Sequence, residues 1–135
     1  METSFHMSLP CLSVKETKVF YTNIGASLGR MTQNWVDVNL FGHQITFIKS
    51  AKFNFNSPNY VFEGKILPSF HFGVVVDIDT WGKVYTKLNN QDLQVVTQAT
   101  FLKDKIGEHV SFFVQDSNGY MLEFKSFKNS KDMFN

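Results

Sequence analysis

Apolar and polar residues alternate strictly near the start of the chain. From residue 5 to residue 11 the odd positions hold Phe, Met, Leu and Cys, and His6 is one of the polar residues between them. A period of two predicts a β-strand with one buried face, here over residues 5–12. Ser13 with Glu16 three residues later is typical of a helix start, and Gly25 is typical of a helix end. We therefore expect a helix between Ser13 and Gly25.

The rest of the chain also contains patterns that are typical of strands and helices, in both halves. Two strands are expected over residues 35–40 and 43–49. In the second half, a run rich in β-branched residues predicts a strand over 70–78. A helix over about 80–89 should follow it, with Asp79 as its N-cap. Each half thus begins with a strand and then a helix.

A hairpin is predicted near the end of the chain. Its strands cover residues 110–115 and 120–127, and the Asp-Ser-Asn-Gly turn between them suits a backbone with positive φ. The segment 51–68, rich in Asn, is expected to be a linker, and residues 128–135 a loose tail. The linker divides the chain into two similar halves.

Short matches relate these two halves. Ser-Phe-His at residues 4–6 recurs at 69–71, and Lys-Val-Phe at 18–20 recurs as Lys-Val-Tyr at 83–85, both 65 residues later. Matches at an offset of 77 pair Gly42 with Gly119, Ile45 with Leu122, and Phe47 with Phe124. Matches in the same order predict a duplicated module, each copy being one strand, a helix and three strands.

Length and composition fit an α+β fold built as one domain over residues 1–135. Hydrophobic residues make up 43% of the chain, with 15 Phe, which is enough for a substantial core. The first βαβββ module should span 4–50 and the second 69–127. The extra residues of the second copy are expected as a longer loop between Leu88 and Glu108.

Charge and cysteine content narrow the function. Charged residues total 19%, the net charge is +1, and no apolar run is long enough to cross a bilayer, so neither nucleic acid nor a membrane is the expected partner. The first residues lack the basic and apolar regions of a secretory signal, and Cys11 is the single cysteine. We therefore expect a cytoplasmic protein that acts on a small molecule.

Strand alternation places several polar residues on one face. His6, His71 and Glu123 each stand between apolar neighbours. The helices should cover those neighbours, so these three side chains point to the other face, as do Gln44 and Thr46. Two imidazoles and a carboxylate suit a divalent metal with open coordination positions. Ordinary hydrogen-bonded histidines remain the alternative from the pattern alone.

The sequence resembles the vicinal oxygen chelate superfamily, which includes glyoxalase I, extradiol dioxygenases, and fosfomycin- and bleomycin-resistance proteins. The residues that carry the resemblance are Phe5-His6, Val19-Phe20-Tyr21-Thr22, Phe41-Gly42-His43-Gln44, His71-Phe72-Gly73-Val74 and the stretch from Asp116 to Phe124. The small extradiol-dioxygenase-like members are the most similar. The resemblance implies paired βαβββ modules in a U-shaped mixed sheet, helices on the outer face, and a homodimer.

The resemblance also implies the metal site. Its ligands carry over onto His6, His71 and Glu123, with Fe(II) as the expected ion and Mn, Zn or Ni as alternatives. Thr46 occupies the position equivalent to Glu123 in the first copy, where four-ligand members carry a further ligand. This difference favours an open, dioxygenase-like site over a lyase or isomerase of the glyoxalase type. Sequestration of a small molecule without turnover is the remaining alternative.

Other residues are candidates for a substrate pocket. Lys125 lies on the face of Glu123 and could pair with a substrate oxyanion, while Gln44 and Thr46 line the inner face of the first copy. His109 follows a loop and has a side chain suited to proton transfer, so it is the candidate catalytic residue. The loop from Asn89 to His109 is expected to shape specificity.

Overall fold

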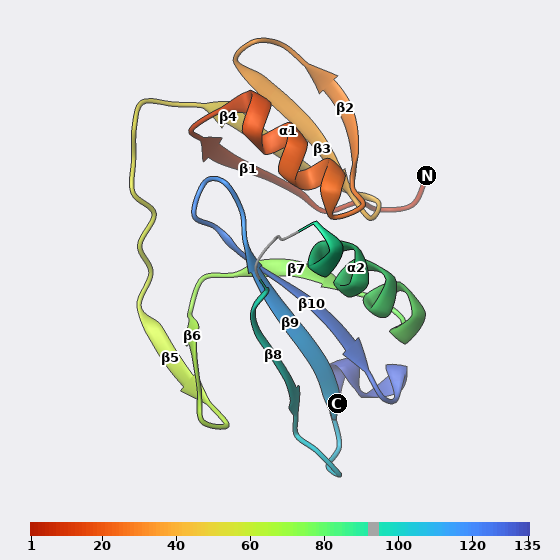
Figure 1. Ribbon diagram of the computed structural model, residues 1–135. Coiled ribbons are helices and arrows are strands. Elements are labelled where there is room, and N and C mark those ends of the chain that lie inside the picture. The colour runs from red at the N-terminus through yellow and green to blue at the C-terminus, as the bar shows by residue number, and fades with distance from the viewer. Residues whose placement is uncertain (92–94) are drawn as a thin grey trace. The chain divides into compact units, whose positions relative to one another are not determined.

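The computed structural model describes residues 1–91 and 95–135. The chain divides into two units (Figure 1). Unit 1 consists of Met1–Phe55 and Asp116–Gly119, and unit 2 consists of Asn56–Gln115 and Tyr120–Asn135.

Unit 1 is a four-stranded sheet with one helix. Its elements are β1 (His6–Cys11), α1 (Val14–Asn23), β2 (Ser27–Met31), β3 (Trp35–Leu40) and β4 (His43–Lys49). The strand order is β1-β4-β3-β2, in which β1 runs parallel to β4 and the other pairs are antiparallel. The predicted order of strand, helix and three strands is confirmed, and β3 and β4 have the predicted limits.

The first helix begins and ends as its sequence predicts. The Ser13 hydroxyl accepts a hydrogen bond from the backbone N–H of Glu16 at 3.1 Å, and Gly25 follows the helix with a φ of 99°. Tyr21 lies against Phe47 with ring centroids 4.8 Å apart. The helix therefore covers the apolar face of the sheet.

A four-residue turn from the second half of the chain belongs to unit 1. The Tyr21 hydroxyl donates to Oδ2 of Asp116 at 2.8 Å. Oδ1 of Asn118 accepts from the backbone N–H of Leu12 at 2.9 Å, and its Nδ2 donates to Oγ1 of Thr17 at 3.2 Å. Asp116 and Asn118 are both buried. These bonds satisfy the backbone N–H of Leu12 just before α1 and the side chains of Thr17 and Tyr21 within it.

Unit 2 contains a second four-stranded sheet. Its elements are β5 (Asn59–Phe62), β6 (Lys65–Pro68), β7 (Phe72–Val75), α2 (Ile78–Asn90), β8 (Val95–Phe101), β9 (His109–Gln115), β10 (Met121–Phe127) and the 3-10 helix η1 (Ser130–Phe134). The order β7-β10-β9-β8, with β7 parallel to β10, repeats the topology of unit 1. Strands β5 and β6 form a separate two-stranded sheet. The α+β fold with tandem βαβββ modules is confirmed.

The ends of several elements in unit 2 differ from those predicted from the sequence. The strand expected over 70–78 is shorter, because Asp77 starts α2 two residues before the expected cap. The Asp77 side chain accepts from the backbone N–H of Thr80 at 2.7 Å, which leaves Asp79 within the first turn. A hairpin occupies part of the segment expected as a linker, and η1 occupies the tail.

Helix α2 covers one face of its sheet. Trp81 and Tyr85 pack on Phe112 with centroids 5.2 and 5.4 Å away, and the Trp81 indole donates to the backbone carbonyl of Phe124 at 2.9 Å. The face that carries Glu123 is therefore the one turned away from the helix. In the described part of the chain, no helix has the length and apolar character needed to cross a membrane.

Candidate active site in the second unit

Strand pairing gathers polar side chains on the free face of unit 2. In the register of β9 and β10, Lys125 lies opposite Ser111 and Phe127 lies opposite His109. Glu123 precedes Lys125 by two residues, so its side chain points to the same face. Two adjacent strands thus supply Ser111, Glu123 and Lys125 together with the imidazole of His109.

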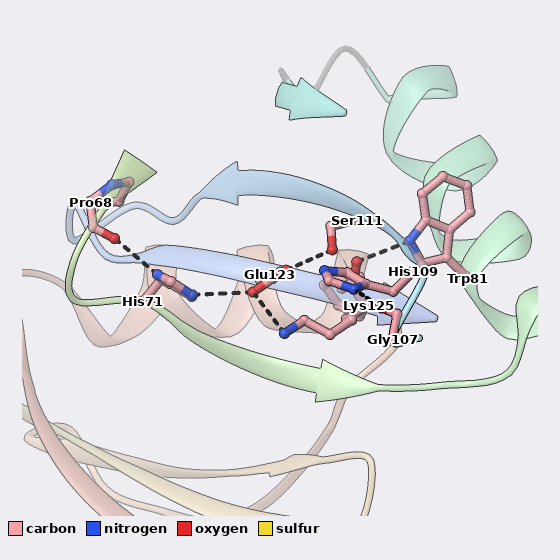
Figure 2. Close-up of polar contacts among 9 residues, drawn as sticks. Pro68, His71, Trp81, Gly107, His109, Ser111, Glu123 and Lys125 are labelled. Atoms are coloured by element: carbon pink, nitrogen blue, oxygen red, sulfur yellow. Dashed lines mark hydrogen bonds and ion pairs between the residues drawn. The ribbon is translucent and has the colours of Figure 1, made fainter. Parts of the chain in front are cut away.

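His71 adds a second imidazole just before β7. Its Nδ1 lies 2.9 Å from the backbone carbonyl of Pro68, and its Nε2 lies 3.1 Å from Oε1 of Glu123 (Figure 2). Because a carbonyl only accepts, Nδ1 carries a proton. In a neutral ring Nε2 therefore presents a lone pair to a carboxylate oxygen. This contact is stable only when a cation, either a proton or a metal ion, lies between the two atoms.

The Glu123 carboxylate is buried but well supplied with donors. The Ser111 hydroxyl donates to Oε2 at 2.6 Å, and Nζ of Lys125 lies 3.8 Å from Oε1 (Figure 2). Burial by itself would raise the pKa of Glu123, but the hydrogen bonds from His71 and Ser111 and the charge of Lys125 hold it below its usual value. The carboxylate is therefore ionised at neutral pH.

The hydrogen bond to Glu123 acts on His71 in the opposite direction. It raises the pKa of the imidazole above its ordinary value, while partial burial opposes the rise and the bond to the Pro68 carbonyl adds to it. In the metal-free protein, the protonated imidazole and the ionised carboxylate thus stabilise each other.

The geometry of this pair also fits a divalent metal. Nε2 of His71 and Oε1 of Glu123, 3.1 Å apart, are an imidazole nitrogen and a carboxylate oxygen, and both atom types are common ligands of such ions. The bond from Nδ1 to the Pro68 carbonyl is the outer contact that metal-binding histidines commonly make. His71 and Glu123 would therefore be two of the residues that hold such an ion.

His6, the third predicted ligand, belongs to unit 1. It is the first residue of β1, is exposed, and pairs with Gln44 in the register of β1 and β4. Within residues 1–91 and 95–135, no group of three or more His, Cys, Asp or Glu side chains is gathered as metal ligands. The structure thus brings His71 and Glu123 together. For His6 it gives the position at the start of β1 in unit 1.

A cavity of about 280 Å³ adjoins the pair in unit 2. Its polar lining is His71, His109, Glu123 and Lys125, and its apolar lining is Tyr60, Phe62, Leu67, Phe101 and Phe113. Tyr60 comes from β5, and its ring is nearly parallel to that of His71 at a centroid distance of 6.3 Å. The cavity has aromatic walls and a cationic and anionic floor, as expected of a site for a small polar ligand.

His109 is positioned by its own loop. Its Nδ1 donates to the backbone carbonyl of Gly107 at 2.8 Å, and the ring is largely buried. Among the residues that the structure describes, Nε2 has no hydrogen-bond partner. Of the loop expected to shape specificity, residues 92–94 lie outside the described residues, and the remainder contributes Phe101 and His109 to the cavity.

Unit 1 holds a separate polar cluster that includes Thr46. Its hydroxyl donates to Oδ1 of Asp37 at 2.7 Å, and Nε of Arg30 lies 3.1 Å from Oδ2. Asp37 is only 5% exposed and lines a cavity of about 310 Å³ together with Gln44. Gln44 therefore lines a cavity with a buried carboxylate of its own unit, and Thr46 contacts that carboxylate without lining the cavity.

Sequence reasoning missed Asp37, Ser111 and the pocket role of Tyr60. Asp37 stands between Val36 and Val38 in a strand, which is the pattern that identified Glu123, so the same signal applied to it. Ser111 is the single hydroxyl residue in an otherwise apolar strand interior. Tyr60 had no such signal because its strand lies within the segment expected as a linker.

The fold is that of the vicinal oxygen chelate proteins, as the sequence resemblance implied. A glyoxalase/bleomycin resistance protein/dioxygenase from Alicyclobacillus acidocaldarius has a TM-score of 0.82 at 22% identity, over 98% of this chain and 97% of that one. The fosfomycin resistance protein FosX from Listeria monocytogenes has a TM-score of 0.70 at 10% identity, over 98% of both chains.

A protein assigned to the glyoxalase family from Bacillus anthracis has a TM-score of 0.68 at 17% identity, over 95% of this chain and 97% of that one. No family model and no curated protein matches the sequence. The structural neighbours therefore establish the fold, and the chemistry rests on the residues of this chain.

Proposed function

We propose that the protein is a metal-dependent enzyme of the vicinal oxygen chelate type, with His6, His71 and Glu123 as ligands and a dioxygenase-like reaction. The observation that carries the proposal is the contact of His71 Nε2 with Glu123 Oε1, which requires a cation between two lone pairs. The third ligand, His6, rests on the Ser-Phe-His repeat. Fe(II) is the metal proposed first, with Mn, Zn and Ni as alternatives.

The cavity residues have distinct roles in this proposal. A bound metal would supply Lewis acidity toward two adjacent substrate oxygens. Lys125 would pair with negative charge that develops on the substrate, since its ammonium group lies at the edge of the Glu123 carboxylate. His109, with Nε2 open, would accept or deliver a proton. The aromatic walls would exclude water from the reacting atoms.

The first test measures metal content and affinity. Protein purified without added metal, and protein loaded with Fe(II) under anaerobic conditions, is analysed by elemental mass spectrometry beside His6→Ala, His71→Ala and Glu123→Ala. We expect about one ion per chain in the wild type and loss of tight binding in each variant. His43→Ala is the matched control, because His43 is an exposed histidine whose Nδ1 accepts a bond from the Phe5 backbone N–H. Absence of metal in every wild-type sample would exclude the proposal.

The second test concerns the reaction. Catechols, hemithioacetals of α-keto aldehydes and epoxides are screened with the loaded protein, and oxygen uptake is recorded in parallel. Ring cleavage with oxygen consumption would support the dioxygenase-like reaction. Conversion of a hemithioacetal or an epoxide without oxygen would replace it by a glyoxalase-type or epoxide-opening reaction.

A binding protein without turnover is the second candidate. The network of Ser111, His71 and Lys125 satisfies Glu123 without a metal, and this observation favours simple sequestration of a small aromatic compound. In that case ligand binding survives Glu123→Gln and metal chelation. Loss of binding on chelation of the wild type would exclude this candidate.

The proposed setting is a cytoplasmic homodimer. The single cysteine, Cys11, is fully buried, which suits a reducing compartment where disulfides are not used. Light scattering at several protein concentrations would measure the oligomeric state.

A further inference from the structure

A second, larger cavity of about 790 Å³ lies at one end of the sheet of unit 2. Its apolar lining comes from five elements and includes Val75, Ile78, Val110, Phe127 and Met133. Several of these side chains are unusually exposed for apolar residues: Ile78 is 59%, Val75 48% and Met133 41% exposed. Apolar side chains gathered at a cavity and left exposed indicate a surface that a ligand covers.

The imidazole of His109 lies at the boundary between the two cavities. His109 lines both of them. Its ring stands between Phe101, which lines the smaller cavity, and Phe127, which lines the larger one, with centroid distances of 5.4 and 5.1 Å. Nζ of Lys125 lies 5.9 Å from the centroid of the Phe127 ring. His109 and the contact of Lys125 with Phe127 therefore join the lining of the smaller cavity to the lining of the larger one.

The two cavities differ in chemistry. The smaller one presents the Glu123 carboxylate and the Lys125 ammonium group. The charged groups of the larger one already have partners: Asp77 caps α2, and Glu108 accepts from the backbone N–H of Asp104 and faces Lys128 at 3.8 Å. Besides the hydroxyl groups of Thr100, Ser126 and Ser130, what the larger cavity offers a ligand is apolar surface.

We propose that the two cavities form one ligand site, in which a small chelating head occupies the smaller cavity and an apolar tail passes His109 into the larger one. The inference rests on the proposed function for the head group and adds the class of substrate. That class is a compound with two adjacent oxygens and a hydrocarbon or aryl tail. A volume of 790 Å³ falls within the usual range of about 300 to 1,000 Å³ for ligand cavities, while 280 Å³ holds only a small head.

A homologous series of chelators tests the tail. Acetohydroxamate, butyrohydroxamate, hexanohydroxamate and octanohydroxamate share one bidentate head, and their affinities are measured by calorimetry with metal-loaded and metal-free full-length protein. We expect affinity to rise about threefold for each added methylene from butyro- to octanohydroxamate, because each one leaves water for an apolar wall. Ile78→Asp should weaken octanohydroxamate at least about tenfold and leave acetohydroxamate within about twofold.

Ile66→Asp is the matched control. Ile66 is 70% exposed on β6 and lines neither cavity, so the same substitution there should leave the whole series unchanged. If acetohydroxamate binds the metal form but longer chains bind no tighter, or if Ile78→Asp behaves as Ile66→Asp does, the tail site is wrong and the metal site stands.

A failure of the metal site gives a different result. If the protein takes up no metal, the proposed function fails. The metal-free protein then still tests the larger cavity. If affinity rises with chain length and Ile78→Asp removes this rise, the apolar site is supported. If affinity is the same for every chain length, the apolar site is excluded.

Discussion

At the scale of single residues, the orientation of Glu123 depends on one hydroxyl group. Ser111 donates to Oε2 at 2.6 Å and thereby leaves Oε1 to face His71. Ser111→Ala removes this donor inside a buried site, so we expect unfolding free energy to fall by about 1–3 kcal/mol. Metal affinity should fall by about 10–100-fold, as for other outer-shell contacts. Urea unfolding and metal titration measure the two effects.

The control for this prediction is Ser27→Ala. Ser27 is an exposed hydroxyl residue on β2, so its loss should change neither quantity. Ser111→Thr keeps the hydroxyl and should recover metal affinity relative to Ser111→Ala. Equal metal affinity in Ser111→Ala and the wild type would show that the carboxylate is oriented by other contacts.

The pair of His71 and Glu123 should give the metal-free protein a defined pH dependence. The pKa of His71 is raised from 6.5, so its contribution is complete below pH 6.5 and is lost as pH rises through the higher folded value. The pKa of Glu123 is lowered from 4.5, so its contribution is complete above pH 4.5 and is lost as pH falls through the lower folded value. The pair therefore stabilises the fold most between pH 4.5 and 6.5.

Unfolding of the wild type and of Glu123→Gln in chelator-treated samples, from pH 3 to pH 9, checks this window. The difference in unfolding free energy between the two proteins should be largest between pH 4.5 and 6.5 and should shrink on both sides. Glu108→Gln serves as a control carboxylate outside the pair. A difference that stays constant across the range would contradict the coupling.

At the scale of elements, the parallel pairing of β7 with β10 requires a glycine. Gly73 lies opposite Glu123 in the register, and a Cβ at Gly73 would overlap the Glu123 main chain, including its carbonyl oxygen. Backbone cannot move aside as a flexible side chain can. Gly73→Ala should therefore destabilise the protein by about 1–3 kcal/mol and displace β7.

Gly82 provides a control, because alanine there should change the stability in the opposite direction. It lies inside α2, and nothing lies within 4 Å of a Cβ added there. Gly82→Ala should stabilise the protein by about 0.5–1 kcal/mol, because alanine favours the helix. Thermal unfolding of both variants compares them directly. If Gly73→Ala is as stable as the wild type, the close approach of β7 and β10 is wrong.

Helix limits illustrate what local sequence can and cannot specify. Ser13 and Glu16 identified the start of α1 because a capping box is a local pattern. In α2 two aspartates compete, and the extended backbone of Asp77 at φ −70° and ψ 165°, which places its carboxylate on the Thr80 N–H, decides between them. Asp77→Ala should accordingly lower the melting temperature more than Asp79→Ala, as circular dichroism would record.

The candidate site was predictable where alternation of faces decides it. Parity placed His71 and Glu123 on one face although His71 precedes its strand, because residues 71 and 73 share a face and Gly73 pairs with Glu123. The cavity walls were not predictable. Tyr60 reaches the site through the β5–β6 hairpin, whose position follows from packing of Phe62 on Phe101 across distant segments rather than from any local period.

At the scale of the whole molecule, the duplication predicts two copies of one topology, and the structure has them. The division into units nevertheless does not follow the repeat, because residues 116–119 of the second copy belong to unit 1. The bond from the Leu12 N–H to Asn118 joins residues far apart in sequence. Neither periodicity nor local turn preference carries that information, since Asn118 also suits its turn.

The stability of unit 1 should therefore depend on Asn118. Asn118→Ala leaves the half-buried Leu12 N–H and the buried Thr17 hydroxyl without this partner, at a cost of about 1–3 kcal/mol. Trp35 and Trp81 are the two tryptophans, one in each unit, so in a Trp81→Phe background the fluorescence of Trp35 reports unit 1. Its urea midpoint should fall in Asn118→Ala and stay unchanged in Asn90→Ala, an exposed asparagine at the end of α2. An unchanged midpoint in Asn118→Ala would mean that the first module folds on its own residues alone.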